Sequence, residues 1–349
     1  MWSKQIPRVR VLQAARTIDV PAGTTILDAA LDAGIDYPFG CQSGNCGACK
    51  SRLMTGEVAM AGYSEFALGE EEKARGLILA CRAVPRADSE VAWIEEDDLV
   101  AHPRRILSCR VIGIDDATHD IKRLRLGIVS GGPFDFSAGQ FASVTFDGCP
   151  PRDYSMANVP GDPTLEFHVR HGSGGATSAY VRDRLKLGDE ARIEGPFGAS
   201  HLRESHRGPI IAVAGGSGLA PIKSIVERAL ALALPQHIHL YFGVRTVRDL
   251  YLDEHFAALA DRHSTLRFTP VVTEGPSGGH RTGLVHDAVA ADFASFDGCK
   301  AYLAGPPALV EAATTLFEQR GMRRSDIHAD AFYTAAEMAR AGKKTGADL

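Results

Sequence analysis

The sequence predicts a multidomain protein of α+β and α/β class, with a small mixed sheet, an antiparallel six-stranded barrel and a doubly wound parallel sheet. Three successive patterns along the 349 residues support this: short strands around one helix, then strands alone, then alternating strands and helices. A chain of this length is long enough for two or three domains with separate cores. We expect domains over residues 1–98, 106–207 and 208–333, a linker at 99–105 and a flexible tail at 334–349.

The first segment begins with two strands and a helix. Residues 8–12 and 16–20 alternate between apolar and polar side chains, which is typical of a β-hairpin. The pair Thr24-Thr25 then predicts the N-cap of a helix over residues 26–33, which Gly34 ends. The helix leads directly into a loop that contains three cysteines.

Four cysteines have the spacing of an iron–sulfur site. Cys41, Cys46 and Cys49 form a C-x4-C-x2-C pattern, and Cys81 follows after 31 intervening residues. This is the plant-type [2Fe–2S] spacing, in which four thiolates bind two irons. Zinc favours two C-x2-C pairs or one pair with two histidines, and a disulfide framework favours a secreted protein. We expect the remaining cysteines to be ordinary half-buried thiols: Cys109, Cys149 and Cys299.

Charge and hydropathy exclude two classes of partner. The net charge of −5, without a basic stripe, argues against nucleic-acid binding. No apolar run reaches the ~20 residues that cross a bilayer. The residues after Met1 do not form a signal segment, so we expect a cytoplasmic protein without a membrane partner.

The negative charge is concentrated in the cysteine-bearing segment. Residues 1–100 contain 10 Lys and Arg against 15 Asp and Glu, whereas the remainder is balanced at 28 against 28. The acidic runs at residues 70–72 and 95–98 indicate either a solvated surface or a docking face for a basic redox partner.

The two later segments differ in period. After Pro103, strands separated by turn residues predict an antiparallel barrel, with strands at residues 108–114, 121–126, 140–146, 164–170 and 190–194. From Gly208, strands alternate with helices, which predicts a parallel sheet. The expected strands are 209–214, 237–242, 266–272 and 300–304, and the expected helices are 222–234, 253–260, 285–291 and 308–321.

A glycine-rich turn lies between the first strand and first helix of the parallel sheet. It contains Gly215, Gly216, Ser217, Gly218 and Pro221. Such glycines let backbone amides approach a pyrophosphate at the positive end of a helix. The second strand ends near Arg245, and Asp249 follows. An acid here binds a ribose 2′-hydroxyl and an arginine accepts a 2′-phosphate, so both NADH and NADPH stay open.

The barrel segment offers a second place for a pyrophosphate. Arg152 and the helix start after Gly174-Gly175 supply a guanidinium and backbone amides. Tyr154 beside Ser155 has the chemistry to stack on a flat ring and hydrogen-bond to it. The alternative is that Tyr154 is half-buried core and Arg152 a surface charge.

Together these motifs resemble the ferredoxin–NAD(P)H reductase superfamily in the form with an N-terminal plant-type ferredoxin domain. The similarity is greatest to reductase components of aromatic-ring dioxygenases of the naphthalene 1,2-dioxygenase type. The residues that carry it are the cysteine loop and residues 154–157, 215–221, 241–245 and 328–333. It implies a β-grasp-like [2Fe–2S] ferredoxin domain, a FAD-binding barrel and an NAD(P)-binding domain.

The resemblance also implies residue roles. Arg152 would contact the FAD pyrophosphate, Tyr154 would stack on the isoalloxazine, and Ser155 would lie near flavin N5. The further FAD-binding residues that it implies are His168, Val169, Arg170, Gly174, Gly175, Ala176, Ser178 and Phe332. The NAD(P)-binding residues that it implies beyond the glycine-rich turn are Arg245, Asp249, Gly305, Pro306 and Pro307.

The implied function is electron transfer from NAD(P)H through FAD and the cluster to a Rieske-type ferredoxin or a terminal oxygenase. No side chain is expected to act as general acid, general base or nucleophile, because the cofactors carry the chemistry. A di-iron hydroxylase or a sugar-nucleotide deoxygenase is an alternative partner. A non-enzymatic iron–sulfur carrier or redox sensor is the alternative from another class, although a pure carrier needs neither three domains nor two pyrophosphate sites.

Overall fold

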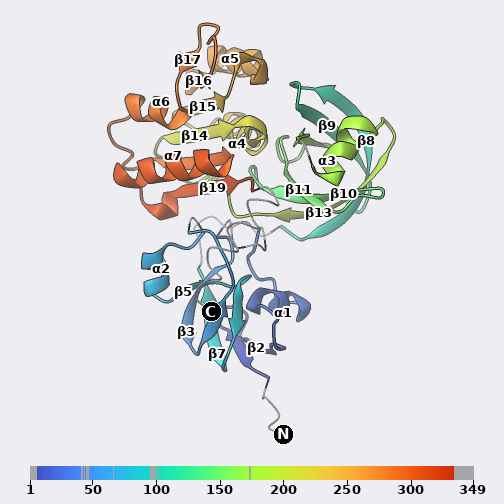
Figure 1. The fold of residues 1–349 in the computed structure, drawn as a ribbon, viewed down its shortest axis with the longest axis vertical. Coiled ribbons are helices and arrows are strands. Elements are labelled where there is room, and N and C mark those ends of the chain that lie inside the picture. The colour runs from blue at the N-terminus through green and yellow to red at the C-terminus, as the bar shows by residue number, and fades with distance from the viewer. Residues whose placement is uncertain are drawn as a thin grey trace. The chain divides into compact units, whose positions relative to one another are not determined.

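The computed structural model of the chain contains two compact units, within residues 1–99 with 333–349 and within residues 100–332 (Figure 1). The residues that it describes are 6–40, 42, 44, 47–65, 67–94, 100, 102–172 and 174–333. The predicted tail lies outside them, and the predicted domain boundaries stay predictions.

The first unit is a five-stranded mixed sheet in the order β2-β1-β7-β3-β5, with a separate two-stranded sheet, β4-β6. Its strands are β1 (Arg8–Val11), β2 (Arg16–Asp19), β3 (Lys50–Thr55), β4 (Val58–Met60), β5 (Leu77–Leu79), β6 (Ala83–Pro85) and β7 (Ser89–Trp93). Its helices are α1 (Ile26–Asp32) and α2 (Glu70–Ala74). The predicted hairpin is confirmed, because β1 pairs antiparallel with β2, and β1 also runs parallel to β7 as in a β-grasp sheet.

Helix α1 crosses this sheet and supplies much of its core. Thr25 caps the helix by accepting the Asp28 N–H at 3.1 Å, and Gly34 follows the helix with a φ of +69°. Both features confirm the predicted helix signals. Ile26 and Leu27 are fully buried against the sheet.

The second unit begins with a six-stranded sheet in the order β11-β10-β13-β8-β9-β12, in which every pair is antiparallel. Its strands are β8 (Arg105–Asp116), β9 (Ile121–Ser130), β10 (Phe141–Phe146), β11 (Arg152–Ser155), β12 (Thr164–Arg170) and β13 (Glu190–Phe197). A bridge between Met156 and Phe167 brings the two edge strands together. The predicted barrel is thereby confirmed, and its helix α3 (Ala176–Asp183) follows β12.

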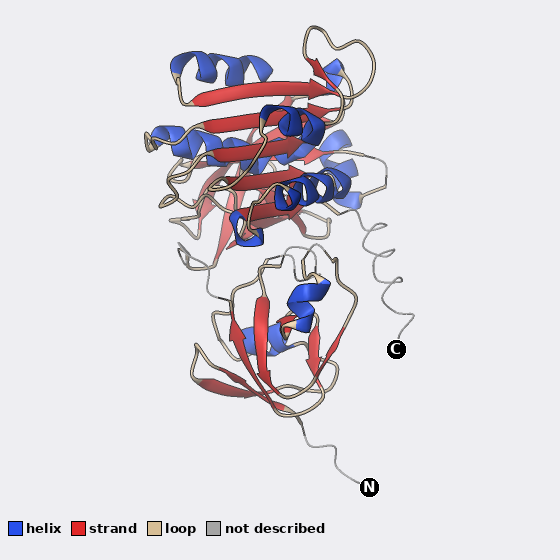
Figure 2. Cartoon of the chain, turned by 90° about the vertical axis from the view of Figure 1, so that its left-hand side faces the viewer, coloured by secondary structure: helices blue, strands red, loops and turns tan. Residues whose placement is uncertain are grey.

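A six-stranded parallel sheet completes the second unit, in the order β17-β16-β15-β14-β18-β19 (Figure 2, strands red and helices blue). Its strands are β14 (Ile210–Gly215), β15 (Ile238–Val244), β16 (Leu266–Val272), β17 (Arg281–Thr282), β18 (Lys300–Gly305) and β19 (Ile327–Ala331). Its helices are α4 (Leu219–Ala231), α5 (Asp253–Arg262), α6 (Val285–Asp292) and α7 (Pro307–Gln319). All strand pairs are parallel, as predicted.

The helix after the glycine-rich turn differs from its predicted range. We expected residues 222–234, but α4 covers 219–231. Pro221 does not delay the start, because the amides of the first helical turn have no intrahelical partner and proline is tolerated there. Ala233 has a φ of +50°, which ends the helix early.

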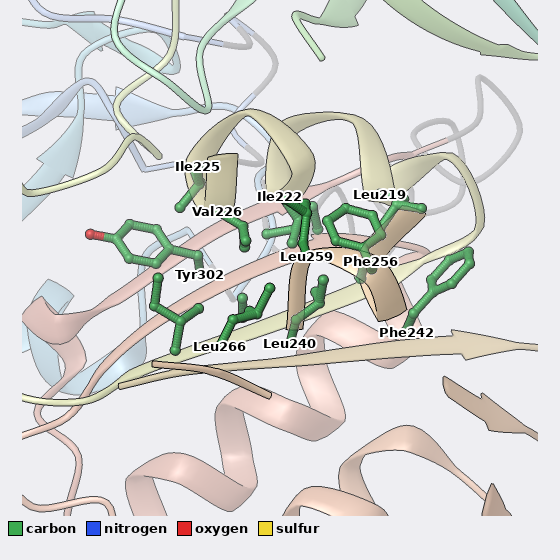
Figure 3. Packing of buried hydrophobic residues seen from close by; sticks show 14 of the residues in the cluster. Leu219, Ile222, Ile225, Val226, Leu240, Phe242, Phe256, Leu259, Leu266 and Tyr302 are labelled. Carbon is green, nitrogen blue, oxygen red and sulfur yellow. The ribbon is translucent and has the colours of Figure 1, made fainter. Parts of the chain in front are cut away.

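The parallel sheet is buried on both faces, which explains its continuous apolar strands. In β14, Ile210, Ala212 and Ala214 join one core cluster with residues of α4 and α5, and the alternate residues face the opposite layer. Figure 3 shows Ile222, Ile225 and Val226 of α4 in this cluster. Ala138 and Leu202 of the barrel segment belong to it too, so apolar contacts hold the barrel against the sheet.

No helix in the described part of the chain combines the length and apolar character that a membrane span requires.

His328 is a buried histidine in β19, at the far edge of the sheet. Its ring stacks on Tyr302 with 5.3 Å between ring centroids. Burial and the nearby charge of Arg203 hold the pKa of His328 well below its ordinary value. The ring is therefore neutral in the folded protein at neutral pH.

We expect the protein to lose stability as the pH falls below about 6.5. Because the pKa of His328 is lower in the folded chain, the unfolded chain binds more protons in this window, and acid favours unfolding. His328→Gln should reduce the change in melting temperature between pH 7 and pH 5, where ~1 kcal/mol corresponds to about 2–4 °C. Calorimetry measures this change. The exposed His237→Gln is the control, and an unchanged pH dependence in His328→Gln would contradict the expectation.

Candidate cluster and nucleotide sites

The cysteine site belongs to the first unit. Cys41 and Cys46 lie outside the described residues, but Cys49 and Cys81 are both buried, at 3% and 4% exposure. The Cys81 N–H donates to Cys49 Sγ, with 3.5 Å between nitrogen and sulfur. N–H···S bonds tune the potential of an iron–sulfur cluster. This pair therefore fits a cluster ligand set.

Two glycines shape the loop around these cysteines. Gly44 and Gly47 have φ values of +79° and +76°, which favour glycine. A Cβ on Gly44 would lie 2.9 Å from Cβ of Tyr63, so a side chain would displace its neighbour. A Cβ on Gly47 would lie 3.1 Å from the Ala67 carbonyl oxygen. The loop therefore depends on glycine at both positions.

The other three cysteines all lie in the second unit. Cys149 is half-buried, as predicted, but Cys109 and Cys299 are buried, so the expectation of half-buried thiols is wrong for these two. Each occupies a buried position within a strand or directly before one, where a small apolar thiol fits. Burial raises the pKa of Cys109 to about 11, which keeps it a thiol.

The structure brings the predicted FAD pyrophosphate residues together. Arg152 begins β11 and is exposed, and Gly175 is the N-cap residue of α3. The Thr177 hydroxyl donates to the Pro150 carbonyl at 3.0 Å, so the start of α3 is held beside the start of β11. Gly174 is exposed with a φ of +109°, Ala176 is exposed, and Ser178 donates to the Gly175 carbonyl. A guanidinium beside an open helix N-terminus fits a pyrophosphate.

Tyr154 and Ser155 continue β11 from this point. Tyr154 is half-buried, and burial raises its pKa to about 12. Ser155 is 6% exposed, and its hydroxyl donates to Asp330 Oδ2 at 3.0 Å. Asp330 lies in β19, two residues before the predicted flavin-covering Phe332, whose N–H donates to the Gly305 carbonyl.

Asp330 is a site residue that was not predicted individually from the sequence. The motif at residues 328–333 contains this acid two positions before Phe332. That spacing was the signal that identifies Asp330. The hydrogen bond to Ser155 shows that β19 meets the barrel at the predicted flavin site.

Strand β12 presents its predicted residues in two directions. Val169 points into the barrel core and is fully buried. The neighbouring His168 instead contacts Tyr251, and a Cβ on Gly216 would lie 3.5 Å from a guanidinium nitrogen of Arg170. The side chains of His168 and Arg170 therefore face the parallel-sheet part of the unit. The backbone of this strand is available for the FAD contact that the resemblance implies.

The predicted nucleotide residues converge at the centre of the parallel sheet. Gly215 ends β14, which lies between β15 and β18 where the strand order reverses, the usual ligand position in such sheets. Ser217 lies in a short 3-10 turn, Gly216–Gly218, that leads into α4. A Cβ on Gly218 would lie 2.2 Å from the Ala304 carbonyl oxygen. Gly305, Pro306 and Pro307 lead from β18 into α7.

The side chains of Asp249 and Arg245 differ in whether they are available to bind a ligand. Asp249 Oδ2 accepts both the N–H and the hydroxyl of Thr246 at 2.8 Å, so its carboxylate caps a turn. Arg245 and Arg248 are exposed, and within the described ranges neither guanidinium has a hydrogen bond or ion pair. The end of β15 thus offers arginine, rather than a free carboxylate, to a ligand.

Comparisons with known proteins agree with this geometry. Residues 9–86 match the 2Fe-2S iron-sulfur cluster binding domain, residues 108–202 the oxidoreductase FAD-binding domain and residues 212–315 the oxidoreductase NAD-binding domain. A flavin barrel and a nucleotide-binding sheet joined to an iron–sulfur domain define a flavin-dependent oxidoreductase.

Relatives over the whole length make this more specific. The ferredoxin–NAD(P)+ reductase component of the naphthalene 1,2-dioxygenase/salicylate 5-hydroxylase systems of a Ralstonia species is 42% identical, with 90% of this chain and 95% of the relative covered. The corresponding naphthalene 1,2-dioxygenase component of Pseudomonas putida is 39% identical, with 91% and 96% covered. A solved cytochrome P450 reductase of Amycolatopsis has a TM-score of 0.77 at 38% identity, with 94% and 99% covered.

The chain belongs to the family of three-domain ferredoxin–NAD(P)+ reductase components. Its cofactors are a [2Fe–2S] cluster, FAD and a nicotinamide nucleotide, as the resemblance implied.

We expect Cys81→Ala to abolish the cluster, because it removes one of four thiolate ligands. Iron content and visible absorbance of the purified protein measure the loss. Cys109→Ala removes a buried thiol of the barrel and is the matched control, which should retain full iron content. A Cys81→Ala protein with an intact cluster, or bound zinc in place of iron in the native protein, would contradict the ligand assignment.

Proposed function

We propose that this reductase oxidises NAD(P)H and delivers single electrons to a Rieske-type ferredoxin or directly to a terminal aromatic-ring oxygenase. The observation that carries the proposal is the Ser155–Asp330 hydrogen bond, which joins the flavin side of the barrel to the edge of the nucleotide-binding sheet. The partner class is supported by the relatives, which are components of naphthalene dioxygenase systems.

The described residues account for binding and orientation at the flavin. A bound FAD would supply the hydride acceptor and the conversion of two-electron to one-electron transfer. Arg152 and the amides at the start of α3 hold the pyrophosphate, and Tyr154 supports the ring. Asp330 fixes the donor direction of the Ser155 hydroxyl and leaves its lone pairs for the ring edge. Phe332, half-buried after β19, excludes water from the same place.

A haem monooxygenase is a second candidate partner. It is favoured by the structural similarity to the Amycolatopsis cytochrome P450 reductase, which has a TM-score of 0.77. Reduction assays with a Rieske ferredoxin and with a cytochrome P450 as acceptors distinguish the two classes, because only the matching acceptor should turn over at low concentration.

We expect an anaerobic titration with NADH or NADPH to bleach the flavin absorbance and the iron–sulfur absorbance together. Electrons that enter at the nucleotide site must reach the cluster if the three domains act in series. Cys81→Ala is the control, in which only the flavin absorbance should bleach. Bleaching of the flavin alone in the native protein would contradict the electron path, and no bleaching with either nucleotide would contradict the reductase function.

We expect the reductase to accept NADPH through the free arginines after β15. The double variant Arg245→Gln/Arg248→Gln removes two charges that a 2′-phosphate would contact, so the KM for NADPH should rise about tenfold. The KM for NADH should change less than about twofold, because NADH lacks that phosphate. Steady-state kinetics with both nucleotides measure this. Arg262→Gln on α5 is the control, and equal changes for the two nucleotides would contradict the assignment.

A further inference from the structure

Helix α4, which starts at the glycine-rich turn, is hydrogen-bonded to the barrel. Lys223 Nζ donates to the Ala157 carbonyl at 3.0 Å, and the Ser224 hydroxyl donates to the Asn158 carbonyl at 2.7 Å. Both acceptors follow Ser155 in the barrel by two or three residues. The helical residues that follow the turn are therefore hydrogen-bonded to the barrel segment directly after Ser155.

A second set of buried contacts reaches the turn itself. Tyr251, 4% exposed, places its hydroxyl oxygen 3.0 Å from His168 Nδ1 and 3.3 Å from the Gly216 carbonyl oxygen. His168 Nε2 lies 2.9 Å from Glu166 Oε1 on the same face of β12. The hydrogen-bond chain thus runs from Glu166 of the barrel through two buried rings to Gly216 of the turn.

The protonation states give this chain a direction. Burial opposes ionisation of Glu166, but the His168 hydrogen bond and the Lys223 charge outweigh it and lower the pKa of Glu166 to about 2. Glu166 is then an acceptor only, and Nε2 of His168 donates to it. Burial also lowers the pKa of His168, so its Nδ1 carries no proton and accepts from the Tyr251 hydroxyl.

Tyr251 keeps its proton, because burial raises its pKa well above the ordinary value. His168 Nδ1, at 3.0 Å, and the Gly216 carbonyl oxygen, at 3.3 Å, share that single proton in a three-centre hydrogen bond, and the carbonyl also accepts the Leu219 N–H. The shared Tyr251 proton is therefore a second, weaker donor to the Gly216 carbonyl beside the Leu219 N–H, and the His168 ring fixes where that hydroxyl lies.

The charged surroundings of the chain are balanced by neighbours on three elements. Lys223 lies 3.7 Å from Glu166 Oε2 and 3.0 Å from Glu227 Oε2, both measured from Nζ. His255 of α5 lies 2.6 Å from the other oxygen of Glu227, and Arg123 of β9 pairs in register with His168. Because these charges compensate one another, the neutral His168 ring is left to act by its hydrogen bonds.

The orientation of one peptide unit connects this chain to ligand binding. In a trans peptide the carbonyl of Gly216 and the N–H of Ser217 point in opposite directions. A donor that holds the carbonyl inward therefore aims the Ser217 N–H outward, toward the position of a pyrophosphate at the helix start. Gly216 has a φ of +54°, a conformation in which glycine is freer than other residues and gains most from such a restraint.

We propose that Tyr251 and His168 are positioning residues for the nicotinamide nucleotide, which hold the Gly216–Ser217 peptide in the orientation that binds its pyrophosphate. This inference rests on the proposed function for its substrate. It assigns the side chain of His168 to the nucleotide turn and leaves its backbone for the FAD contact that the resemblance implies.

The test is Tyr251→Phe, which removes one hydroxyl and keeps the ring. Calorimetric Kd values for NAD+ and NADP+ should both rise about three- to tenfold, the loss of one buried hydrogen bond. The KM for NAD(P)H should rise in parallel, with kcat within about twofold. FAD content and the dithionite titration of flavin and cluster should not change, because the Tyr251 hydroxyl contacts only the His168 ring and the Gly216 carbonyl among the described residues.

Tyr241→Phe is the matched control. The Tyr241 hydroxyl is also buried in the same sheet, but it donates to Asp292 at 2.7 Å and does not touch the turn. The Tyr241→Phe variant should lower the melting temperature as Tyr251→Phe does, and it should leave the Kd values for NAD+ and NADP+ unchanged. Unchanged Kd values in Tyr251→Phe, or equal rises in the two variants, would overturn the inference.

His168→Gln provides a second variant. If the two residues act as one chain, the double variant Tyr251→Phe/His168→Gln should raise the Kd values no more than the larger single effect. Additive effects would overturn the chain. Failure of the proposed function appears separately, as native protein that binds the nucleotides and reduces neither flavin nor cluster.

Discussion

The relative position of the flavin barrel and the nucleotide-binding sheet is the constraint on which the second unit depends. An apolar core shared by Ala138, Leu202 and Ile225 holds the two together without specifying an exact register. Lys223 supplies that register, because a nearly buried ammonium must find acceptors, and its acceptors lie on both parts. Removing one partner of such a buried pair typically costs about 3–5 kcal/mol. Polar groups therefore fix the orientation of the barrel relative to the sheet, and apolar contacts hold the two together.

Close backbone packing serves the same alignment at the centre of the sheet. A Cβ on Gly305 would lie 2.6 Å from the Gly215 carbonyl oxygen, and one on Gly218 would lie closer still to Ala304. These glycines let two loops from adjacent strands meet without side chains between them. The nucleotide turn thus gains its shape from neighbours distant in sequence, and its open face from the absence of side chains there.

Much of this could be predicted from the sequence, since periodicity and spacing are local. The strand Thr164–Arg170 matches its predicted range, and the glycine-rich turn lies between β14 and α4 as expected. Contacts that depend on tertiary placement could not be predicted. Nothing local shows that Asp330 meets Ser155, or that His168 faces Tyr251, because each pair joins segments more than 80 residues apart. The start of α4 differs from the expected one because apolar periodicity does not locate the first helical turn, where proline is tolerated.

The hydrophobic core around α1 is built from one continuous segment of the sequence. Every residue of that cluster, from Val9 to Trp93, comes from the first unit. The residues that form this core are therefore contiguous in the gene, between positions 9 and 93. A recombination event after this segment would transfer the complete core of the iron–sulfur domain and leave the flavoprotein core intact. Evolution can in this way pair one hydride-accepting half with different one-electron outlets, and so with different oxygenases.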